Sequence, residues 1–430
     1  MSPLLLLLLG LLSLVLCVLR GRSRRDGEPP LIKGWIPFIG KALEFGRDAH
    51  KFLEEHKKKF GDIFTVQIAG KYMTFIMDPL MYPSIIKHGR QLDFNEFSNT
   101  VAPFTFGYPP VISRKFPGMR EKIKRSFHLL QGDSLTPLTE SMMSNLMLLF
   151  RQDHLEERPG DDGGWRSGSM YEFCYTVMFE ATFLTMYGRP LSAIRHSRMG
   201  VLREDFIKFD IMFPLLIAQI PLWLLGQTKA IREKLINYFL PHRMSCWSNM
   251  SQFIKRRSEV FNQYDSLTDS HKAESAISES LRLSSASMNI RVAQENFDLR
   301  LDSERSVAVR KGDIIALYPQ SMHLDPDIYE EPQTFQFDRY MQDGRERTDF
   351  YKNNQKLKHY LMPFGSGSSM CPGRFFAINE IKQFLCLLLL YFDVQVEDGQ
   401  TRATLDSNRA GLGILQPTTD VRFRYRLRTV

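Results

Sequence analysis

A single cysteine, Cys371, lies between a glycine-rich loop and a strongly apolar segment, in the stretch YLMPFGSGSSMCPGRFFAINEIKQFLCLLLLYF. Pro372 suits the first position of a helix, so we expect a long helix to begin directly after the cysteine. A helix N-terminus carries a partial positive charge and free N–H groups, and both favour a thiolate over a thiol. A thiolate at this position can bind a metal, act as a nucleophile or sense redox state.

The residues around Cys371 favour the metal-ligand interpretation. Gly365, Gly367 and Gly373 have no side chains, so the backbone can approach a flat cofactor and aim amide donors at the sulfur. Phe364 can pack beside such a cofactor. A nucleophilic or redox-sensing cysteine would not require the glycines and the flanking aromatic residues together. A haem iron held by a thiolate, whose sulfur donates electron density toward O–O cleavage, requires both.

Three motifs in order carry a resemblance to a known family. FGSGSSMCPG resembles the haem-binding loop of the cytochrome P-450 family, Phe-x-x-Gly-x-x-x-Cys-x-Gly, ESLR resembles the family's Glu-x-x-Arg motif, and FDRY follows it. The resemblance implies haem b with Cys371 as its axial ligand. It also implies a buried ion-pair network of Glu279, Arg282 and Arg339. Alone, a glutamate and an arginine three residues apart on a helix usually form a surface pair.

The haem loop departs from the family at one position. Many members have a basic residue two positions before the cysteine, which binds a haem propionate, whereas this chain has Ser369. Arg291, after the Glu-x-x-Arg segment, resembles the family's other propionate-binding residue. A bidentate contact between an arginine and a carboxylate would suit that role.

Longer stretches resemble the sterol-oxidising branch of the family. GEPPLIKGWIPFIG, ESLRLSSASMNIR and SNRAGLGILQP resemble sterol 7α-hydroxylases, whereas KFGDIFTVQIAGKYMTFIMDP and DVRFRYRLR equally resemble sterol 12α-hydroxylase and prostacyclin synthase. The resemblance implies hydroxylation of cholesterol or an oxysterol, first of all at the 7α position, in bile acid and cholesterol metabolism. Electrons would come from NADPH through the NADPH–cytochrome P-450 reductase. A 12α-hydroxylase, an isomerase that needs no reductase and a catalytically inactive chain remain alternatives.

The resemblance also suggests residues that contact the substrate or the reductase. The substrate candidates are Ser287, Met288 and Asn289 after the Glu-x-x-Arg segment, and Leu412, between Gly411 and Gly413, near the C-terminus. Asn289 could bind a sterol hydroxyl, or it could be a turn residue that bonds its own backbone. Lys356, Lys358 and Arg374 are candidate docking cations for an acidic reductase surface, although solvated surface charge explains each of them equally well.

The remaining pattern predicts a mainly α-helical fold with small β-sheets near both ends, which is the cytochrome P-450 fold. GDIFTVQIAGKYMTFIMDP alternates as a β-hairpin would, and residues 119–262 are mostly helical in pattern. Pro214 and Pro221 interrupt the apolar segment 209–226, which is either buried core or a lipid-contacting lid. Short strands follow from residue 292, and VRFRYRLRTV predicts a final strand.

One part of the family fold is missing from the sequence. Members have a long helix over the haem, shortly before the Glu-x-x-Arg helix, and it guides protons to bound oxygen. From Arg256 to Ser278 this chain has no apolar run long enough for a buried helix of about 30 residues, each rising about 1.5 Å. We therefore expect an internal block to be absent near residues 256–278, and no catalytic residue can be named.

The N-terminus and the composition limit location and partners. Leu4 to Leu19 is an apolar run near the lower limit for a membrane span, and arginines follow it, as in a signal anchor rather than a cleaved signal peptide. We expect an anchor at 1–19, a linker at 20–30 and a catalytic domain at 31–430 on the cytosolic side of the endoplasmic reticulum membrane. The net charge of +8 includes no basic stripe with interleaved aromatic residues, which argues against nucleic-acid binding. Five scattered cysteines without a CxxC pair predict neither a disulfide framework nor a zinc site.

Overall fold

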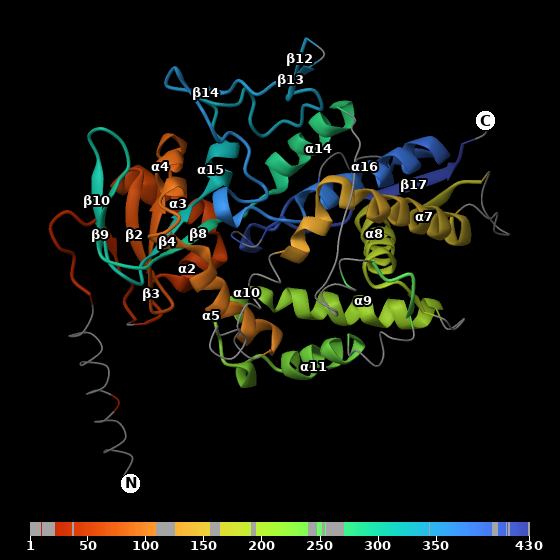
Figure 1. Ribbon diagram of the computed structural model, residues 1–430, viewed down its shortest axis with the longest axis horizontal. Helices are drawn as coiled ribbons and strands as arrows, with labels where there is room; N and C mark the ends of the chain where they lie inside the picture. Colours follow the sequence, from red (N-terminus) through yellow and green to blue (C-terminus); the bar gives the residue numbers. More distant parts are fainter. Residues whose placement is uncertain are drawn as a thin grey trace, which may run out of the picture.

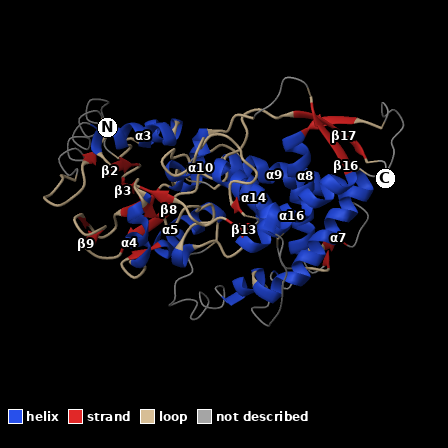
Figure 2. Cartoon of the chain, turned by 90° about the horizontal axis from the view of Figure 1, so that it is seen from above, coloured by secondary structure: helices blue, strands red, loops and turns tan. Residues whose placement is uncertain are grey.

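The computed structural model shows a β-rich region at one end of the molecule and helices over most of the rest (Figures 1 and 2). It describes residues 10, 22–36, 38–108, 125–154, 164–190, 195–239, 247–251, 254, 271–343, 345–397, 403–409, 411 and 413–428. The predicted anchor at 1–19 lies outside these residues, apart from Gly10, and so do residues 256–270 of the segment in which we expect a missing block.

The main sheet joins strands from residues 31–93 to strands from residues 289–317. Its order is β1 (Leu31–Ile32), β2 (Ile63–Ile68), β3 (Lys71–Ile76), β11 (Ile314–Leu317), β8 (Asn289–Ala293) and β4 (Leu92–Asp93). The predicted hairpin is confirmed, because β2 and β3 pair antiparallel and the chain turns at Ala69 and Gly70, which both have positive φ. β11 pairs parallel to β3 and antiparallel to β8, so β8 is fixed firmly in the sheet.

Smaller sheets cover the rest of the C-terminal half and the helical region. They pair β9 (Phe297–Arg300) with β10 (Ser306–Val309), β12 (Met341–Gln342) with β13 (Arg345–Glu346), β14 (Tyr351–Lys352) with β15 (Gln355–Lys356), and β6 (Arg189–Pro190) with β7 (Trp247–Ser248). A three-stranded sheet joins β16 (Phe392–Val396), β17 (Arg422–Leu427) and β5 (Arg166–Ser169). The strand predicted at the C-terminus is therefore confirmed.

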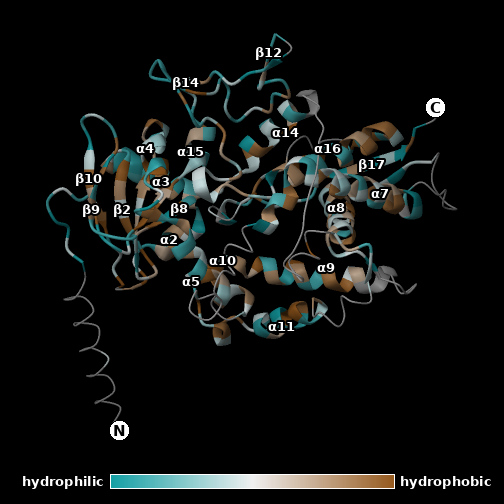
Figure 3. Ribbon diagram, in the orientation of Figure 1, coloured by the Kyte–Doolittle hydropathy of each residue, from teal (hydrophilic) through white to brown (hydrophobic). Residues whose placement is uncertain are grey.

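Helices form the larger part of the described molecule. They are α2 (Ala42–Arg47), α3 (Ala49–Phe60), α4 (Tyr82–Lys87), α5 (Phe94–Phe106), α7 (Leu135–Asp153), α8 (Met170–Tyr187), α9 (Arg195–Ile211), α10 (Phe213–Ile217), α11 (Thr228–Tyr238), α14 (His271–Ser284), α15 (Pro319–His323) and α16 (Arg374–Tyr391). α7, α8 and α16 share one core, in which Phe150 and Phe384 stack with ring centroids 6.1 Å apart. Figure 3 shows both hydrophobic and hydrophilic residues along the described parts of α9 and α11.

The apolar segment 209–226 is broken, as its two prolines predict. α9 ends at Ile211, and α10 is a separate short helix that contains Pro214. Leu216 is fully buried, whereas Trp223 is 81% exposed, so the segment contributes both to the core and to the surface. Among the described helices, none combines the length and the apolar character needed to cross a bilayer.

Candidate haem-thiolate site

The Cys371 loop joins a short 3-10 turn, Gly367–Ser369, to α16. The backbone N–H of Cys371 donates to the carbonyl of Phe364 over 2.8 Å, while the side chain of Cys371 is exposed. Our prediction that the helix starts at Pro372 is wrong, because Gly373 is the N-cap and α16 begins at Arg374. The segment between cysteine and helix closes as a turn instead, with the N–H of Arg374 3.5 Å from the carbonyl of Cys371.

Two glycines are required by the conformation of the loop itself. Gly365 has φ of 80° and Gly367 has φ of 57°, values that favour glycine. A Cβ at Gly367 would lie 2.9 Å from Cγ2 of Ile86, and one at Gly365 would lie 3.2 Å from the carbonyl oxygen of Ser369. These glycines therefore let the backbone turn back closely on its neighbours, in addition to any role beside a flat cofactor.

Strand β8 holds the loop from one side. Nη2 of Arg291 donates to the carbonyl of Ser366 over 2.9 Å, and Oγ of Ser366 donates to Oδ1 of Asn289 over 3.0 Å. Both contacts are buried and bridge more than 70 residues of sequence. The alternative that Asn289 is a turn residue is wrong, because it lies in β8 and its side chain bonds the loop.

Arg291 shows that the site is suited to an anionic group. The side chain is almost fully buried, and burial lowers the pKa of its guanidinium, opposed only in part by the charge of Asp93. Within the described part of the chain, no carboxylate lies within ion-pair distance of Arg291, and Nδ2 of Asn289 is buried without an acceptor. Because a buried guanidinium without an anion is costly, these residues fit a cofactor that carries a carboxylate beside an exposed sulfur.

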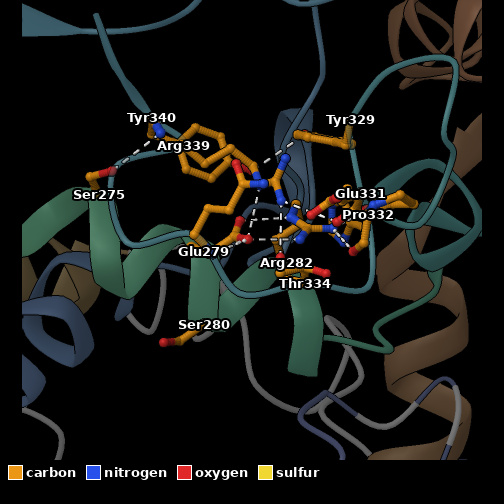
Figure 4. Close-up of polar contacts among 12 residues, drawn as sticks. Ser275, Glu279, Ser280, Arg282, Tyr329, Glu331, Pro332, Thr334, Arg339 and Tyr340 are labelled. Atoms are coloured by element: carbon orange, nitrogen blue, oxygen red, sulfur yellow. Dashed lines mark hydrogen bonds and ion pairs between the residues drawn. The ribbon is translucent and has the colours of Figure 1, made fainter.

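The predicted charged network forms around Glu279 of α14 (Figure 4). Glu279 and Arg282 of α14 are fully buried, with Arg282 Nε to Glu279 Oε2 and Arg282 Nη2 to Glu279 Oε1 both at 2.8 Å. Arg339 donates from Nε to the same Glu279 Oε1 over 2.9 Å. Burial opposes ionisation of Glu279, but the hydrogen bonds from the two arginines outweigh it and hold the pKa of this carboxyl below its ordinary value.

Both arginines of the network also bind backbone carbonyls of the segment that precedes the haem loop. Arg282 donates to the carbonyl of Pro332 over 2.6 Å, and Arg339 donates to that of Glu330 over 2.6 Å and that of Thr334 over 2.9 Å. The network therefore fixes an irregular segment, residues 330–340, against α14. The network has a positioning role, because the Glu279 carboxylate binds both guanidinium groups and these in turn hold the backbone carbonyls of the segment.

The substrate candidates are only partly brought together. Ser287 forms a parallel bridge with Gly411, and a Cβ on Gly411 would lie 3.4 Å from the sulfur of Met288, so these two segments are neighbours. Oγ of Ser287 donates to the carbonyl of Pro363 over 3.3 Å, just before the haem loop. Leu412 lies outside the described residues.

The candidate docking cations differ in their surroundings. Lys356 pairs with Asp349, and Lys358 is exposed. Nη1 of Arg374 donates to the carbonyl of Cys371 over 3.0 Å, so this arginine supports the loop.

Sequence reasoning missed Ser366 and Glu380. Ser366 lies inside the motif, but nothing in the sequence indicates that β8 approaches it. Glu380 is a carboxyl in an otherwise apolar stretch of α16, and this contrast could have marked it in the sequence. It is buried and accepts a hydrogen bond from Thr182 over 2.8 Å. Burial raises the pKa of Glu380 to about 7, opposed by the Thr182 hydrogen bond.

A cysteine loop in front of a long helix, a buried cation that lacks an anion and a Glu–Arg–Arg network together define the class of haem-thiolate proteins. The cytochrome P450 family model matches residues 29–243 and 244–423, and the chain belongs to that family. Membership implies a haem iron with a thiolate ligand, and the fold expected from the motifs is confirmed.

Individual relatives lie in the branch that the sequence predicts. The chain is 39% identical to cytochrome P450 7A1 of Oryctolagus cuniculus, covering 95% of each chain. It is 33% identical to cytochrome P450 7B1 of Mus musculus, covering 97% of this chain and 94% of the relative. It is also 33% identical to 7-alpha-hydroxycholest-4-en-3-one 12-alpha-hydroxylase of Homo sapiens, covering 94% of each.

These comparisons also bear on the length of the chain. The alignment with the Oryctolagus cuniculus relative spans 482 positions, whereas this chain has 430 residues, so at least 52 positions have no residue here. The two ranges matched by the family model meet between residues 243 and 244. The position expected for this shortage, near residues 256–278, stays a prediction, because neither comparison says where along the chain the missing positions fall.

Proposed function

We propose that this chain is a haem-thiolate monooxygenase that hydroxylates a sterol, cholesterol or an oxysterol, at the 7α position. The observation that supports this most strongly is the Cys371 loop, held by Arg291 and Asn289 beside a buried cationic site, in a chain similar to sterol hydroxylases over nearly its whole length. Hydroxylation at 12α is the nearest alternative, because relatives named for that reaction are 33% identical to this chain.

Each residue of the site has a specific role in the proposal. Cys371 would bind the haem iron through its sulfur, and it is a free cysteine on an exposed residue. Arg291 binds a haem propionate, which supplies the anion that its buried guanidinium lacks, and Phe364 packs beside the porphyrin. Gly365 and Gly367 allow the loop to bend under the ring. When bound, haem supplies the chemistry that activates molecular oxygen.

The proposal also names where the chain works and what supplies its electrons. A reductase that oxidises NADPH docks on the face that presents the exposed Lys358, which lies shortly before the Cys371 loop in the sequence. The apolar run at residues 4–19 anchors the chain in the endoplasmic reticulum membrane, and the following arginines keep the catalytic domain on the cytosolic side.

A second candidate function has its own support. At least 52 aligned positions of a relative have no residue in this chain, and the sequence lacks the long helix that guides protons to oxygen. These observations favour a chain that folds and binds haem or lipid but turns over no sterol. The two candidates share the haem loop and differ in catalysis.

The carbon monoxide difference spectrum of the reduced chain, expressed in membranes, tests the haem site. We expect the strongly red-shifted thiolate band in the unaltered chain and in Cys386→Ser, a matched control because Cys386 is also an exposed free thiol, on α16. Cys371→Ser should lose the band. A band that persists in Cys371→Ser would contradict the assignment of the ligand.

Sterol turnover then separates the two candidates. With the thiolate band present, NADPH-dependent hydroxylation of cholesterol or an oxysterol supports the monooxygenase, and the position of the product hydroxyl distinguishes 7α from 12α. Turnover without NADPH would instead indicate an isomerase. A thiolate band without turnover, and without a spin-state shift on sterol titration, supports the inactive chain.

A further inference from the structure

A second candidate site lies away from the Cys371 loop, between α8, α9, α11 and α16. These helices surround a cavity of about 700 Å³, which is within the roughly 300–1,000 Å³ of pockets that hold small organic ligands. Its walls are mostly aromatic, with Phe179 and Phe183 from α8, Phe206 from α9 and Phe239 after α11. No residue of the Cys371 loop contributes to the wall, so the cavity is separate from the haem site.

One acidic side chain faces this aromatic cavity. Glu380 belongs to the wall and is 9% exposed, and its Oε1 accepts a hydrogen bond from Oγ1 of Thr182 over 2.8 Å. Oε2 accepts no hydrogen bond in the described structure and keeps some accessible surface, so it is open to the cavity. The carboxyl group is therefore anchored on one side and available on the other.

The carboxyl group of Glu380 also lacks a counter-ion. Among the described residues, no lysine, arginine or histidine lies within ion-pair distance of it. Arg232, the cation on the cavity wall, donates from Nη1 to the carbonyl of Phe104 over 2.8 Å, whereas its Nε is buried without an acceptor among the described residues. Burial raises the pKa of Glu380 to about 7, opposed by the Thr182 hydrogen bond, and this agrees with a carboxylate that no nearby cation stabilises.

The chemistry of this cavity selects its ligand. Aromatic faces attract cations, and a quaternary ammonium group surrounded by aromatic rings is a recurrent arrangement. A buried carboxylate without a partner is stabilised most by an opposite charge, whereas an alcohol offers it one hydrogen bond. The apolar walls require the rest of the ligand to be apolar.

We propose that this cavity binds an apolar cation, a molecule with an ammonium group on a rod-like or flat hydrophobic body, with the ammonium group beside Glu380 and the body against Phe179, Phe183 and Phe206. The site goes beyond the proposed monooxygenase function, because it requires neither haem nor Cys371.

Two fluorescent probes with the same body test the proposal on the unaltered chain. Diphenylhexatriene is neutral, and trimethylammonium-diphenylhexatriene adds a quaternary ammonium group, which has no lone pair and cannot bind iron. Titration in one detergent buffer, with the protein-free buffer as the blank, should show saturable binding of both. We expect the charged probe to bind about tenfold more tightly, which corresponds to about 1.4 kcal/mol. Equal affinity, or tighter binding of the neutral probe, overturns the proposal.

Variants then locate the binding. Glu380→Gln keeps the size of the side chain and an acceptor for Thr182, and it should abolish the preference for the charged probe while leaving the neutral probe unchanged. Met178→Trp, on the cavity wall, should weaken both probes at least tenfold by filling the space. Retention of the charge preference in Glu380→Gln overturns the assignment to this cavity.

The outcome is independent of the haem proposal. Because the comparison of the two probes uses the unaltered chain, it decides the charge preference even where a variant does not fold. A missing thiolate band together with a normal charge preference would refute the haem assignment and leave this site standing. The reverse result would refute this site alone.

Discussion

Replacing Glu279 by glutamine tests the charged network most directly. Glu279 is fully buried, and its two oxygens accept from Arg282 Nε, Arg282 Nη2, Arg339 Nε and the backbone N–H of Gln336, at 2.8 to 3.1 Å. Glutamine has nearly the same shape and keeps one acceptor oxygen. Its amide nitrogen is a donor, however, and in place of Oε2 it would face the donor Nε of Arg282.

The expected cost follows from these contacts. The substitution removes the one carboxylate that balances two buried guanidinium groups, Arg282 at 0% and Arg339 at 6% exposure. Removing one partner of a buried ion pair typically costs about 3–5 kcal/mol, because the remaining charge is left buried without compensation. Glu279→Gln should therefore lower the free energy of opening α14 by about 3 kcal/mol or more.

Hydrogen exchange measured by mass spectrometry reports this opening locally. Since each 1.4 kcal/mol corresponds to a factor of ten, amides of α14 in Glu279→Gln should exchange roughly 100-fold faster or more than in the unaltered chain. The urea midpoint, followed by near-ultraviolet circular dichroism, should fall in the same variant.

Ser280→Ala is the matched control. Ser280 is the next residue of α14, and its exposed hydroxyl donates to the carbonyl of Ala276, away from the network (Figure 4). This variant should change stability by no more than about 0.5 kcal/mol. Exchange in Glu279→Gln within threefold of that in Ser280→Ala would refute the conclusion that the network holds α14 against residues 330–340.

Three further predictions concern the haem loop and α16. Gly367→Ala places a methyl group at φ of 57° and 2.9 Å from Ile86, so it should destabilise the chain by about 1–3 kcal/mol. Gly46→Ala in α2, where a Cβ meets nothing within 4 Å, should instead stabilise the chain by about 0.5–1 kcal/mol. Urea midpoints compare the two variants, and equal shifts would contradict the argument. Arg291→Gln should lower the amount of haem retained through gel filtration at least tenfold, measured as the pyridine haemochrome. The control Arg300→Gln, at an exposed residue, should leave the retained haem unchanged. Equal retention in both variants would exclude Arg291 as a propionate ligand. Burial raises the pKa of Glu380 from an ordinary 4.5 to about 7, so its contribution to stability is complete below pH 4.5 and is lost as the pH rises through 7. The unfolding free energy of the unaltered chain relative to Glu380→Gln should fall by about 2–3 kcal/mol from pH 5 to pH 8, and parallel pH profiles would refute the shift.

The sequence predicted those features whose residues are close together or belong to fixed motifs. The hairpin at residues 63–76, the helical character of the described parts of residues 119–262 and the strand at 422–427 follow from local periodicity. The contacts of Glu279, Arg282 and Arg339 followed from three motifs in order. The start of α16 was misplaced by two residues, because the turn that follows Cys371 depends on the backbone of Gly373, which the proline rule does not describe.

Local sequence patterns could not predict the features that depend on packing between distant segments. The bond between Ser366 and Asn289 joins residues 77 apart, and it exists because β11 fixes β8 in the main sheet. Thr182 meets Glu380 across 198 residues, where α8 and α16 cross. Neither serine nor threonine is unusual in its local sequence, so only the assembled helices and sheet reveal these partners.

The haem loop and the cavity differ in which of the two matched ranges supply their residues. The loop, β8, α14 and Arg339 all lie within the second matched range, 244–423, so the bonds from β8 to the loop and the Glu279 network are made inside that range, while Ile86 and strand β4 support them from the first range. The cavity has walls from α8, α9 and α11, in the first range, and from α16, in the second. It therefore lies where the parts on either side of the junction meet in space. A block missing near residues 256–278 would leave the bonds of Arg291 and Asn289 to the loop in place, because these residues all follow that segment in the chain. For this reason a thiolate spectrum without sterol turnover, together with a charge preference in the cavity, would be a consistent result for this chain.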